Sequence, residues 1–157
     1  MILKEKIQIS RSFSLEPYNE EKHLKKVEEM KKDPELRHFL MRREGLNIIN
    51  YNEESVGYVF FDQLHYLDDS ISITIGIDKD HRSTEEKSGI GSLIISDITN
   101  YLLNNGLCET VVLETLPTDQ RGQKIAEKTL FKRDWNLTAK FYEEGYNEIP
   151  YVKRKER

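Results

Sequence analysis

The sequence predicts a domain of the α/β or α+β class, because segments with strand periodicity and segments with helix periodicity follow one another along the chain. The predicted order is a strand, two helices, three strands, a helix and a strand. No repeat, low-complexity tract or linker interrupts this order, and 157 residues suit a single domain over 1–157. Hydrophobic residues make up 37% and charged residues 33%, which is typical of a chain that folds around one core.

The N-terminal part predicts a strand and then a helix. Weak alternation of apolar residues indicates a strand over Ile7–Leu15. Asn19 is a suitable cap for the following helix, which has acidic residues in its first turn. Leu24, Val27 and Met30 lie at helical spacing, so we expect them to form the buried stripe of that helix.

A second helix and three strands follow. Proline after an aspartate cap is a typical helix start, so a short helix is predicted over Pro34–Leu40. Two strand-like segments, Leu46–Tyr51 and Ser55–Leu64, are separated by turn-forming residues and predict a hairpin. The clearest strand is Ile71–Ile77, where isoleucines alternate with small residues. One face of that strand should therefore belong to the core.

A glycine-rich turn before a helix is the first feature that indicates chemistry. The turn Gly89–Gly91 opens a helix with apolar residues at a period near 3.6, which ends at Asn104–Gly106. Small residues let the backbone approach an anion, and free N–H groups at a helix start, here including that of Ser92, can bind a pyrophosphate. A buried strand over Cys108–Thr115 follows the helix.

Two stretches resemble the GNAT superfamily of N-acetyltransferases. Ile73–Arg82 followed by Lys87–Ile95 is similar to the fourth strand of that family and its Arg/Gln-x-x-Gly-x-Gly/Ala loop. Leu113–Gly122, continuing without a gap to Phe131, is similar to the fifth strand, a short loop and a helix. The resemblance implies a GNAT-like α/β (α+β) fold. That fold has a central mixed, mostly antiparallel seven-stranded sheet, splayed between strands 4 and 5 and flanked by about four helices.

The resemblance also implies a cofactor, acetyl-coenzyme A, bound in the opening between the fourth and fifth strands, and no metal ion. The backbone of the fourth strand would pair with the pantetheine arm, and the loop after it would hold the pyrophosphate. The cofactor-binding residues expected on this basis are Ile75, Gly76, Ile77, Arg82, Lys87, Ser88, Gly89, Ile90, Gly91, Ser92 and Asp119.

The loop departs from the family pattern in one respect. Arg82 stands seven positions before Gly89, whereas the family's Arg or Gln stands three positions before, and Glu86 occupies that standard place. A carboxylate beside a pyrophosphate would be repulsive. We therefore expect residues 83–86 to bulge outward as an insertion, so that Arg82 or Lys87 meets the phosphates.

A second departure concerns the proton donor. If the second stretch is aligned with the family without a gap as far as Phe131 (the gapless register), the family's tyrosine falls on Ala126. An alternative alignment (the rival register) places the last helix over Asn136–Glu144. Alternation over residues 135–142 favours a strand there, in a terminal hairpin with Ile149–Lys153, and so favours the gapless register. Tyr142 is the expected acid in either register.

Glu114, at the end of the fifth strand, is the expected general base, because a carboxylate beside the splay could accept a proton from the amine. Asp119, in the loop that follows, is an alternative base, and a chain of ordered water is another.

The implied activity is transfer of an acetyl group from acetyl-coenzyme A to a primary amine by direct attack on the thioester. The alternative is a GNAT-fold module that binds acyl-coenzyme A with weak or no transferase activity, which Ala126 and the longer loop would suit. The acceptor partner is expected to be a small-molecule or peptide amine, and a homodimer is compatible with the sequence. The net charge of -4 disfavours nucleic acid as a partner. The N-terminus shows no membrane span or secretion signal, so a cytoplasmic protein with no membrane partner is expected.

Overall fold

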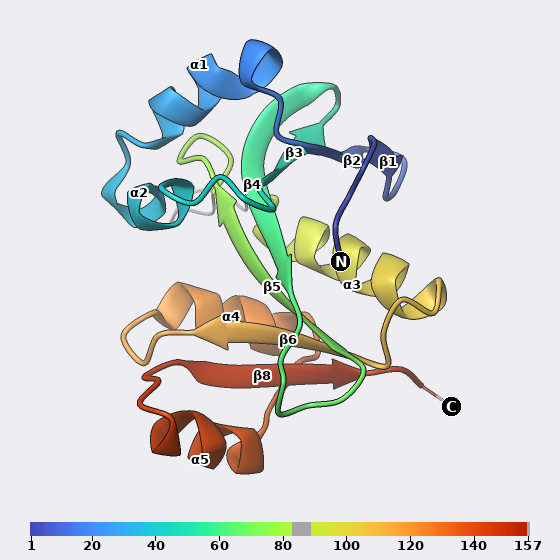
Figure 1. Cartoon of the computed structure of the whole chain (residues 1–157), viewed down its shortest axis with the longest axis vertical. Coiled ribbons are helices and arrows are strands. Elements are labelled where there is room, and N and C mark those ends of the chain that lie inside the picture. The colour runs from blue at the N-terminus through green and yellow to red at the C-terminus, as the bar shows by residue number, and fades with distance from the viewer. Residues whose placement is uncertain (83–88, 157) are drawn as a thin grey trace.

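The computed structural model describes residues 1–82 and 89–156, which form one sheet with helices on both faces (Figure 1). The strands are β1 (Ile7–Gln8), β2 (Phe13–Pro17), β3 (Asn47–Tyr51), β4 (Glu54–Asp62), β5 (Ser70–Ile77), β6 (Thr110–Thr115), β7 (Lys132–Arg133) and β8 (Ile149–Arg154). The helices are α1 (Glu20–Met30), α2 (Pro34–Leu40), α3 (Gly91–Asn104), α4 (Gln120–Lys128) and α5 (Trp135–Glu143).

The sheet is mixed and mostly antiparallel, as predicted. Its strand order is β1-β2-β3-β4-β5-β6-β8-β7. β5 and β6 run parallel because α3 crosses between them, and the other neighbours that the structure describes are antiparallel. The described chain has eight strands rather than seven, because the strand predicted over Ile7–Leu15 breaks into β1 and β2.

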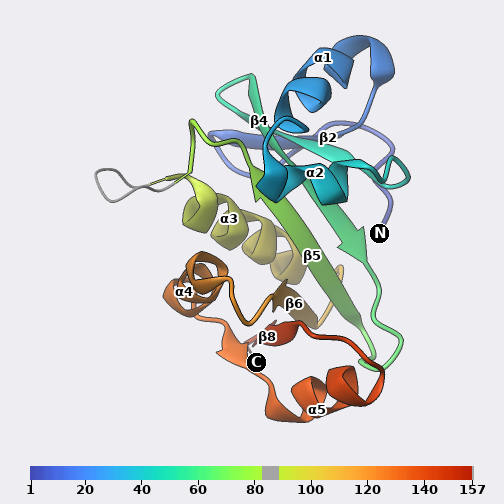
Figure 2. The same ribbon diagram turned by 90° about the vertical axis from the view of Figure 1, so that its left-hand side faces the viewer.

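The helices form two layers (Figures 1 and 2). On one face, α1 and α2 pack against β3 and β4, and α5 packs against β6 and β8. On the other face, α3 and α4 cover β5 and β6 through a larger core that includes Ile73, Ile98 and Ala126. Among the helices of the described ranges, none is long and apolar enough to cross a membrane.

The two N-terminal helices form as their caps predict. Asn19 accepts a hydrogen bond from the Lys22 amide, and the N-cap of α2, Asp33, accepts one from the first turn of that helix. The buried stripe of α1 differs from the prediction, because His23 is buried and Leu24 is 40% exposed. His23 tolerates burial because its two ring nitrogens both find hydrogen-bond partners.

The C-terminal part corrects the sequence interpretation. The gapless register is confirmed, since α4 follows β6 directly. The strand predicted over residues 135–142 is wrong, because this segment forms α5, as the rival register required. Asp134 caps the helix by accepting a hydrogen bond from the Leu137 amide at 2.9 Å. The strand that pairs with β8 is instead the short strand β7. Because α5 is a helix, the described chain has five helices rather than about four.

Candidate active site

Strands β5 and β6 separate part-way along their length and leave an opening in the middle of the sheet. The last rung of their parallel ladder joins Ile73 to Leu113. Beyond that rung, β5 continues to Ile77 paired with β4, and β6 continues to Thr115 paired with β8. In Figure 1 the two strands diverge toward the left of the view. The splay predicted between the fourth and fifth strands is therefore confirmed, and it lies between β5 and β6.

Ile75 and Ile77 direct their backbone groups into this opening. The Asp78 amide donates to the Val56 carbonyl of β4 at 2.8 Å. Alternate residues of an antiparallel ladder face alternate edges, so Gly76 turns its N–H and C=O toward β4 together with Asp78. Ile75 and Ile77 turn theirs toward the opening. The expectation that Gly76 pairs with a bound arm is corrected, because its backbone groups belong to the β4–β5 ladder.

Gly76 instead leaves room for Tyr58 of β4. A Cβ atom on Gly76 would lie 2.3 Å from the Tyr58 Cε1 and 2.5 Å from its hydroxyl oxygen. Burial, and secondarily the charge of Asp33, raise the pKa of Tyr58 well above its usual range, against an opposing effect of Arg82. A protonated phenol therefore lies beside the open part of β5, a feature that the sequence interpretation missed.

Helix α3 begins next to the opening without a side-chain cap. Its N-cap residue is Ile90, which makes no side-chain hydrogen bond to the first turn. Within the described ranges, the first-turn amides of Gly91 and Ser92 therefore receive no cap of the usual kind. A Cβ atom on Gly91 would lie 3.5 Å from the Ile125 side chain, so the start of α3 adjoins α4.

The loop between β5 and α3 is closed at its base. The Ile90 amide donates to the His81 carbonyl at 3.0 Å, which brings Gly89 back beside the end of β5. The expected features that lie outside the described residues are Lys87, Ser88 and the outward bulge over 83–86.

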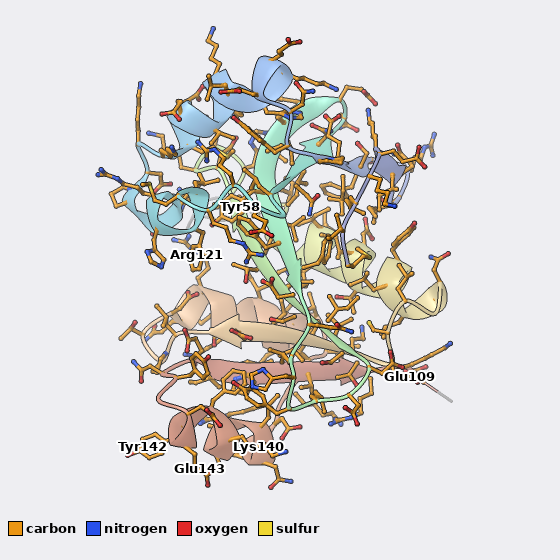
Figure 3. The ribbon with its side chains drawn as sticks, in the orientation of Figure 1. Tyr58, Glu109, Arg121, Lys140, Tyr142 and Glu143 are labelled. Carbon is orange, nitrogen blue, oxygen red and sulfur yellow. The ribbon has the colours of Figure 1, made fainter. Side chains whose placement is uncertain are left out.

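Arg82, which was expected to meet the phosphates, is engaged by two carboxylates of the α2 start. Its guanidinium donates to Asp33 and to Glu35. Arg121, in the first turn of α4, donates to the same Oε2 atom of Glu35 at 3.2 Å. These contacts join α2, α4 and the end of β5, and Figure 3 shows Arg121 between α2 and α4. No sequence pattern singled out Arg121 or Glu35.

Glu114 lies on the β6 side of the opening, one residue past the last rung of the ladder. Its carboxylate accepts a hydrogen bond from the Ser72 hydroxyl at 3.0 Å. Burial raises the pKa of Glu114, the Ser72 bond lowers it, and the charges of Glu148 and Asp62 raise it, with a net upward shift. The side chain nevertheless keeps access to solvent. A carboxyl that holds its proton to higher pH than usual therefore stands in an accessible position.

The sequence interpretation missed Tyr66, a tyrosine of the β4–β5 loop. Burial, a hydrogen bond with Tyr146, which follows α5, and the charges of Glu144 and Glu114 raise the pKa of Tyr66. The Tyr66 ring also packs edge-on against Phe141 of α5, with ring centroids 5.9 Å apart. The loops bring these residues together, so no local periodicity could have identified them.

Asp119, expected near the cofactor and considered as an alternative base, is the N-cap of α4. Its carboxylate accepts a hydrogen bond from the Gly122 amide at 2.9 Å. A Cβ atom on Gly122 would lie 2.4 Å from that carboxylate, so the cap depends on a glycine three residues later. The Asp119 carboxylate therefore serves the start of α4 in this structure.

Tyr142, the expected acid, lies on the outer surface of α5 and is 82% exposed (Figure 3). The helix turns about 100° per residue, so the neighbouring Phe141 packs against the sheet while Tyr142 points into solvent. The structure therefore does not bring Tyr142 to Glu114.

The comparisons with known proteins show likeness in fold and not in sequence. No protein-family model matches the chain, and no curated protein matches it. A GNAT-family acetyltransferase structure from Bacillus anthracis superposes with a TM-score of 0.71 at 12% identity, covering 97% of this chain and 99% of the other.

Two ligand-bound structures are also similar. RimL, a ribosomal L7/L12 α-N-protein acetyltransferase in complex with coenzyme A, gives a TM-score of 0.68 at 14% identity, covering 96% of this chain and 98% of the other. The microcin C7 self-immunity acetyltransferase MccE, in complex with acetyl-CoA and AMP, gives 0.67 at 13% identity, with 98% of each chain covered. Agreement over nearly the whole length of each protein shows that this chain has the fold of the GNAT acetyltransferases.

Proposed function

We propose that this protein is an acetyl-coenzyme A-dependent N-acetyltransferase that moves an acetyl group onto a primary amine. The observation that carries the proposal is the meeting of three features at one opening. These are the edge of β5 beyond Ile73, which has no strand partner among the described residues on that side, the start of α3 at Gly91, and the accessible Glu114 carboxyl. The similar structures of RimL with coenzyme A and of MccE with acetyl-CoA support it.

The residues around the opening fit acetyl-coenzyme A. Ile75 and Ile77 present backbone groups that can pair with the amides of the pantetheine arm. The amides at the start of α3, with small Gly89 and Gly91 beside them, suit the pyrophosphate. When bound, acetyl-coenzyme A would supply an acetyl thioester, whose carbonyl carbon an uncharged amine can attack.

Glu114 is the proposed general base. An ammonium group has no free electron pair, so it must lose a proton before its nitrogen can bond to the acetyl carbon. A carboxyl with a raised pKa is a stronger base than an ordinary one, which makes Glu114 a suitable acceptor of that proton. As the new C–N bond forms and the C–S bond breaks, the departing sulfur carries a negative charge. Tyr58, whose buried hydroxyl lies against Gly76 of β5, is the proposed donor to that sulfur.

The proposed acceptor is a cationic primary amine of a small molecule or a peptide. The charge of Glu148 acts on Glu114, as does that of Asp62, which is paired with Arg42; the carboxylates of Glu114 and Glu148 therefore favour a cation over an anion. RimL is described as an α-N-protein acetyltransferase. A peptide α-amine is therefore included among the acceptors to be tested.

Calorimetric titration with acetyl-coenzyme A tests the cofactor site. We expect micromolar-range binding by the unaltered protein and loss of binding in Gly91→Glu, whose added bulk and negative charge would oppose a phosphate at the start of α3. Gly91→Ala is the matched control, because its Cβ would make ordinary contact, 3.5 Å from Ile125. Absence of binding by the unaltered protein would contradict the proposal.

Turnover distinguishes the enzyme from the binding module. Free thiol release is measured with diamines, aminoglycosides and peptides, and each peptide is paired with the same peptide blocked at its N-terminus. Release that needs a free amine supports the transferase. Tight binding of acetyl-coenzyme A with no thiol release for any amine would favour an acyl-coenzyme A-binding module.

A further inference from the structure

The Glu35 carboxylate lies between two guanidinium groups that come from opposite walls of the opening. Arg82 follows β5, and Arg121 lies in the first turn of α4, directly after β6. We propose that Arg82 and Arg121 form a binding site for a phosphate group of the cofactor, which Glu35 occupies until the phosphate displaces it. This inference rests on the proposed function and adds Arg121 and Glu35 to the cofactor site.

The arrangement of donors suits a phosphate. Both guanidinium groups donate to one oxygen atom, Oε2 of Glu35. Converging arginine donors match the oxygens of carboxylates and phosphates alike, and the pyrophosphate as a whole, like the 3′-phosphate, carries more negative charge than one carboxylate. A phosphate placed there would therefore compete directly with Glu35.

Glu35 is the member of this group that can move. Its side chain is 60% exposed, whereas those of Asp33 and Arg82 are 15% exposed. Asp33 is also fixed as the N-cap of α2. Ion pairs at exposed positions contribute little to stability, so exchanging Glu35 for a phosphate costs the fold little. Arg82 would stay anchored to Asp33 during that exchange.

A second observation places this site beside the phosphate loop. Ile125 lies one helical turn after Arg121, and these two residues share a face of α4. Ile125 adjoins Gly91 at the start of α3, while Arg82 is the last described residue before the loop that Gly89 ends. The two arginines therefore flank the helix start that is proposed to bind the pyrophosphate.

The exchange would also affect α2. In the structure, Glu35 ties α2 to α4 across the opening. When a phosphate takes the place of Glu35, this tie is released while Asp33 still holds α2 to Arg82. Cofactor binding would therefore release the contact between α2 and α4 and leave the contact between α2 and Arg82 in place.

Calorimetric titration of charge-matched variants tests the inference. Glu35→Gln removes the competing charge and should tighten acetyl-coenzyme A binding by roughly 3- to 10-fold. Arg121→Gln should weaken it by about 10-fold. The control is Glu143→Gln, which removes the same charge from an exposed position on α5 that Figure 3 shows far from Arg121, and should leave affinity unchanged.

Two shortened ligands identify the phosphate. Acetyl-pantetheine has none, so Glu35→Gln should leave its affinity unchanged. Acetyl-dephospho-coenzyme A lacks the 3′-phosphate but keeps the pyrophosphate. A gain with Glu35→Gln that persists for this ligand assigns the site to the pyrophosphate, and a gain that disappears assigns it to the 3′-phosphate; either result supports the exchange.

The inference is overturned if Glu35→Gln leaves acetyl-coenzyme A binding unchanged or weaker, or tightens acetyl-pantetheine equally. Such results with a protein that still binds acetyl-coenzyme A would leave the proposed function intact. If the unaltered protein does not bind acetyl-coenzyme A, the proposed function and this inference both fail. A gain of affinity cannot arise from a variant that fails to fold.

Discussion

The Ser72 hydroxyl donates a hydrogen bond of 3.0 Å to the Glu114 carboxylate, from one strand of the diverging pair to the other. This bond favours the ionised form of Glu114, whereas burial and two neighbouring carboxylates favour the protonated form. The balance leaves the pKa of Glu114 above its usual range, and the carboxylate lies where β5 and β6 part.

Replacing Glu114 with glutamine should lower kcat/KM by roughly 10²- to 10⁴-fold, because the amide cannot accept the proton of the amine. The affinity for acetyl-coenzyme A should not change. The variant should be at least as stable as the unaltered protein, because a neutral amide removes the repulsion from Glu148 and Asp62. Steady-state kinetics, calorimetry and thermal unfolding measure the three quantities. Full activity in Glu114→Gln would exclude it as the base.

Replacing Ser72 with alanine should move the pH dependence of the rate. The base acts when deprotonated, so the rate rises with pH through the pKa of Glu114. Loss of the Ser72 bond raises that pKa further, so the rising limb of kcat/KM should move to higher pH. Ser70→Ala is the control, since the Ser70 hydroxyl donates to the Leu67 carbonyl and should not shift the profile.

Replacing Tyr58 with phenylalanine should lower kcat by roughly 10- to 100-fold, because the phenol can no longer give a proton to the departing sulfur. The ring that packs over Gly76 is retained, so the dissociation constant of acetyl-coenzyme A should stay the same. Comparison of kcat with the calorimetric dissociation constant separates the two effects. An unchanged kcat would place the donor elsewhere, with Tyr66 the next phenol to test.

Glu16 should make stability depend on acid pH. Burial alone would raise the pKa of Glu16, but hydrogen bonds from Asn50, Lys22 and His23 lower it to about 2 from 4.5. A lowered folded-state pKa means that the stabilisation is complete above about 4.5 and is lost as the pH falls toward about 2. At neutral pH, Glu16→Gln should therefore cost roughly 3 kcal/mol.

Urea unfolding at several pH values measures this effect. The difference between the unaltered protein and Glu16→Gln should shrink as the pH falls. Glu21→Gln, which changes the same charge at an exposed position of α1, should cost little at any pH. A Glu16→Gln deficit that stays constant with pH would show that ionisation of Glu16 does not contribute.

Local signals predicted most of the fold. Asn19 and Asp33 cap helices because their side chains reach backbone amides within three residues, so the nearby sequence is sufficient. The alternation in Ile71–Ile77 predicted β5, because a strand with one buried face needs apolar residues at every second position. The burial of His23 was not predicted, because it depends on a contact with Glu16 of β2.

The segment after β7 shows where periodicity misleads. Trp135, Leu137 and Phe141 all lie at odd-numbered positions, as residues on one face of a strand do. Leu137 and Phe141 are also four residues apart, as residues on one face of a helix are. The structure buries that pair and leaves Trp135 68% exposed, stacked beneath the Arg133 guanidinium at 3.7 Å. The cap at Asp134 was the local sign of a helix.

The site was partly predictable. The sequence singled out the Gly89–Gly91 turn and Glu114 as candidates, since both belong to patterns within a few residues of a strand end. The contact between Glu35 and Arg121 could not be inferred, because these residues are 86 positions apart and meet through the packing of two helices. Tyr58 could not be identified from the sequence either, because its place in the site depends on its pairing with Gly76 across the β4–β5 ladder.

The short β5–β6 ladder has a consequence for solubility. Exposed strand edges invite pairing with other chains and so promote aggregation, and proteins normally blunt or cover them. Here the edge of β5 beyond the ladder lies in the interior of the sheet, where Ile77 is 6% exposed. The contact between Arg121 of α4 and Glu35 of α2 also joins these two helices. Pairing with a strand of another protein would require these covering elements to move apart. The strand edge that would promote aggregation at the rim of the sheet is therefore shielded here.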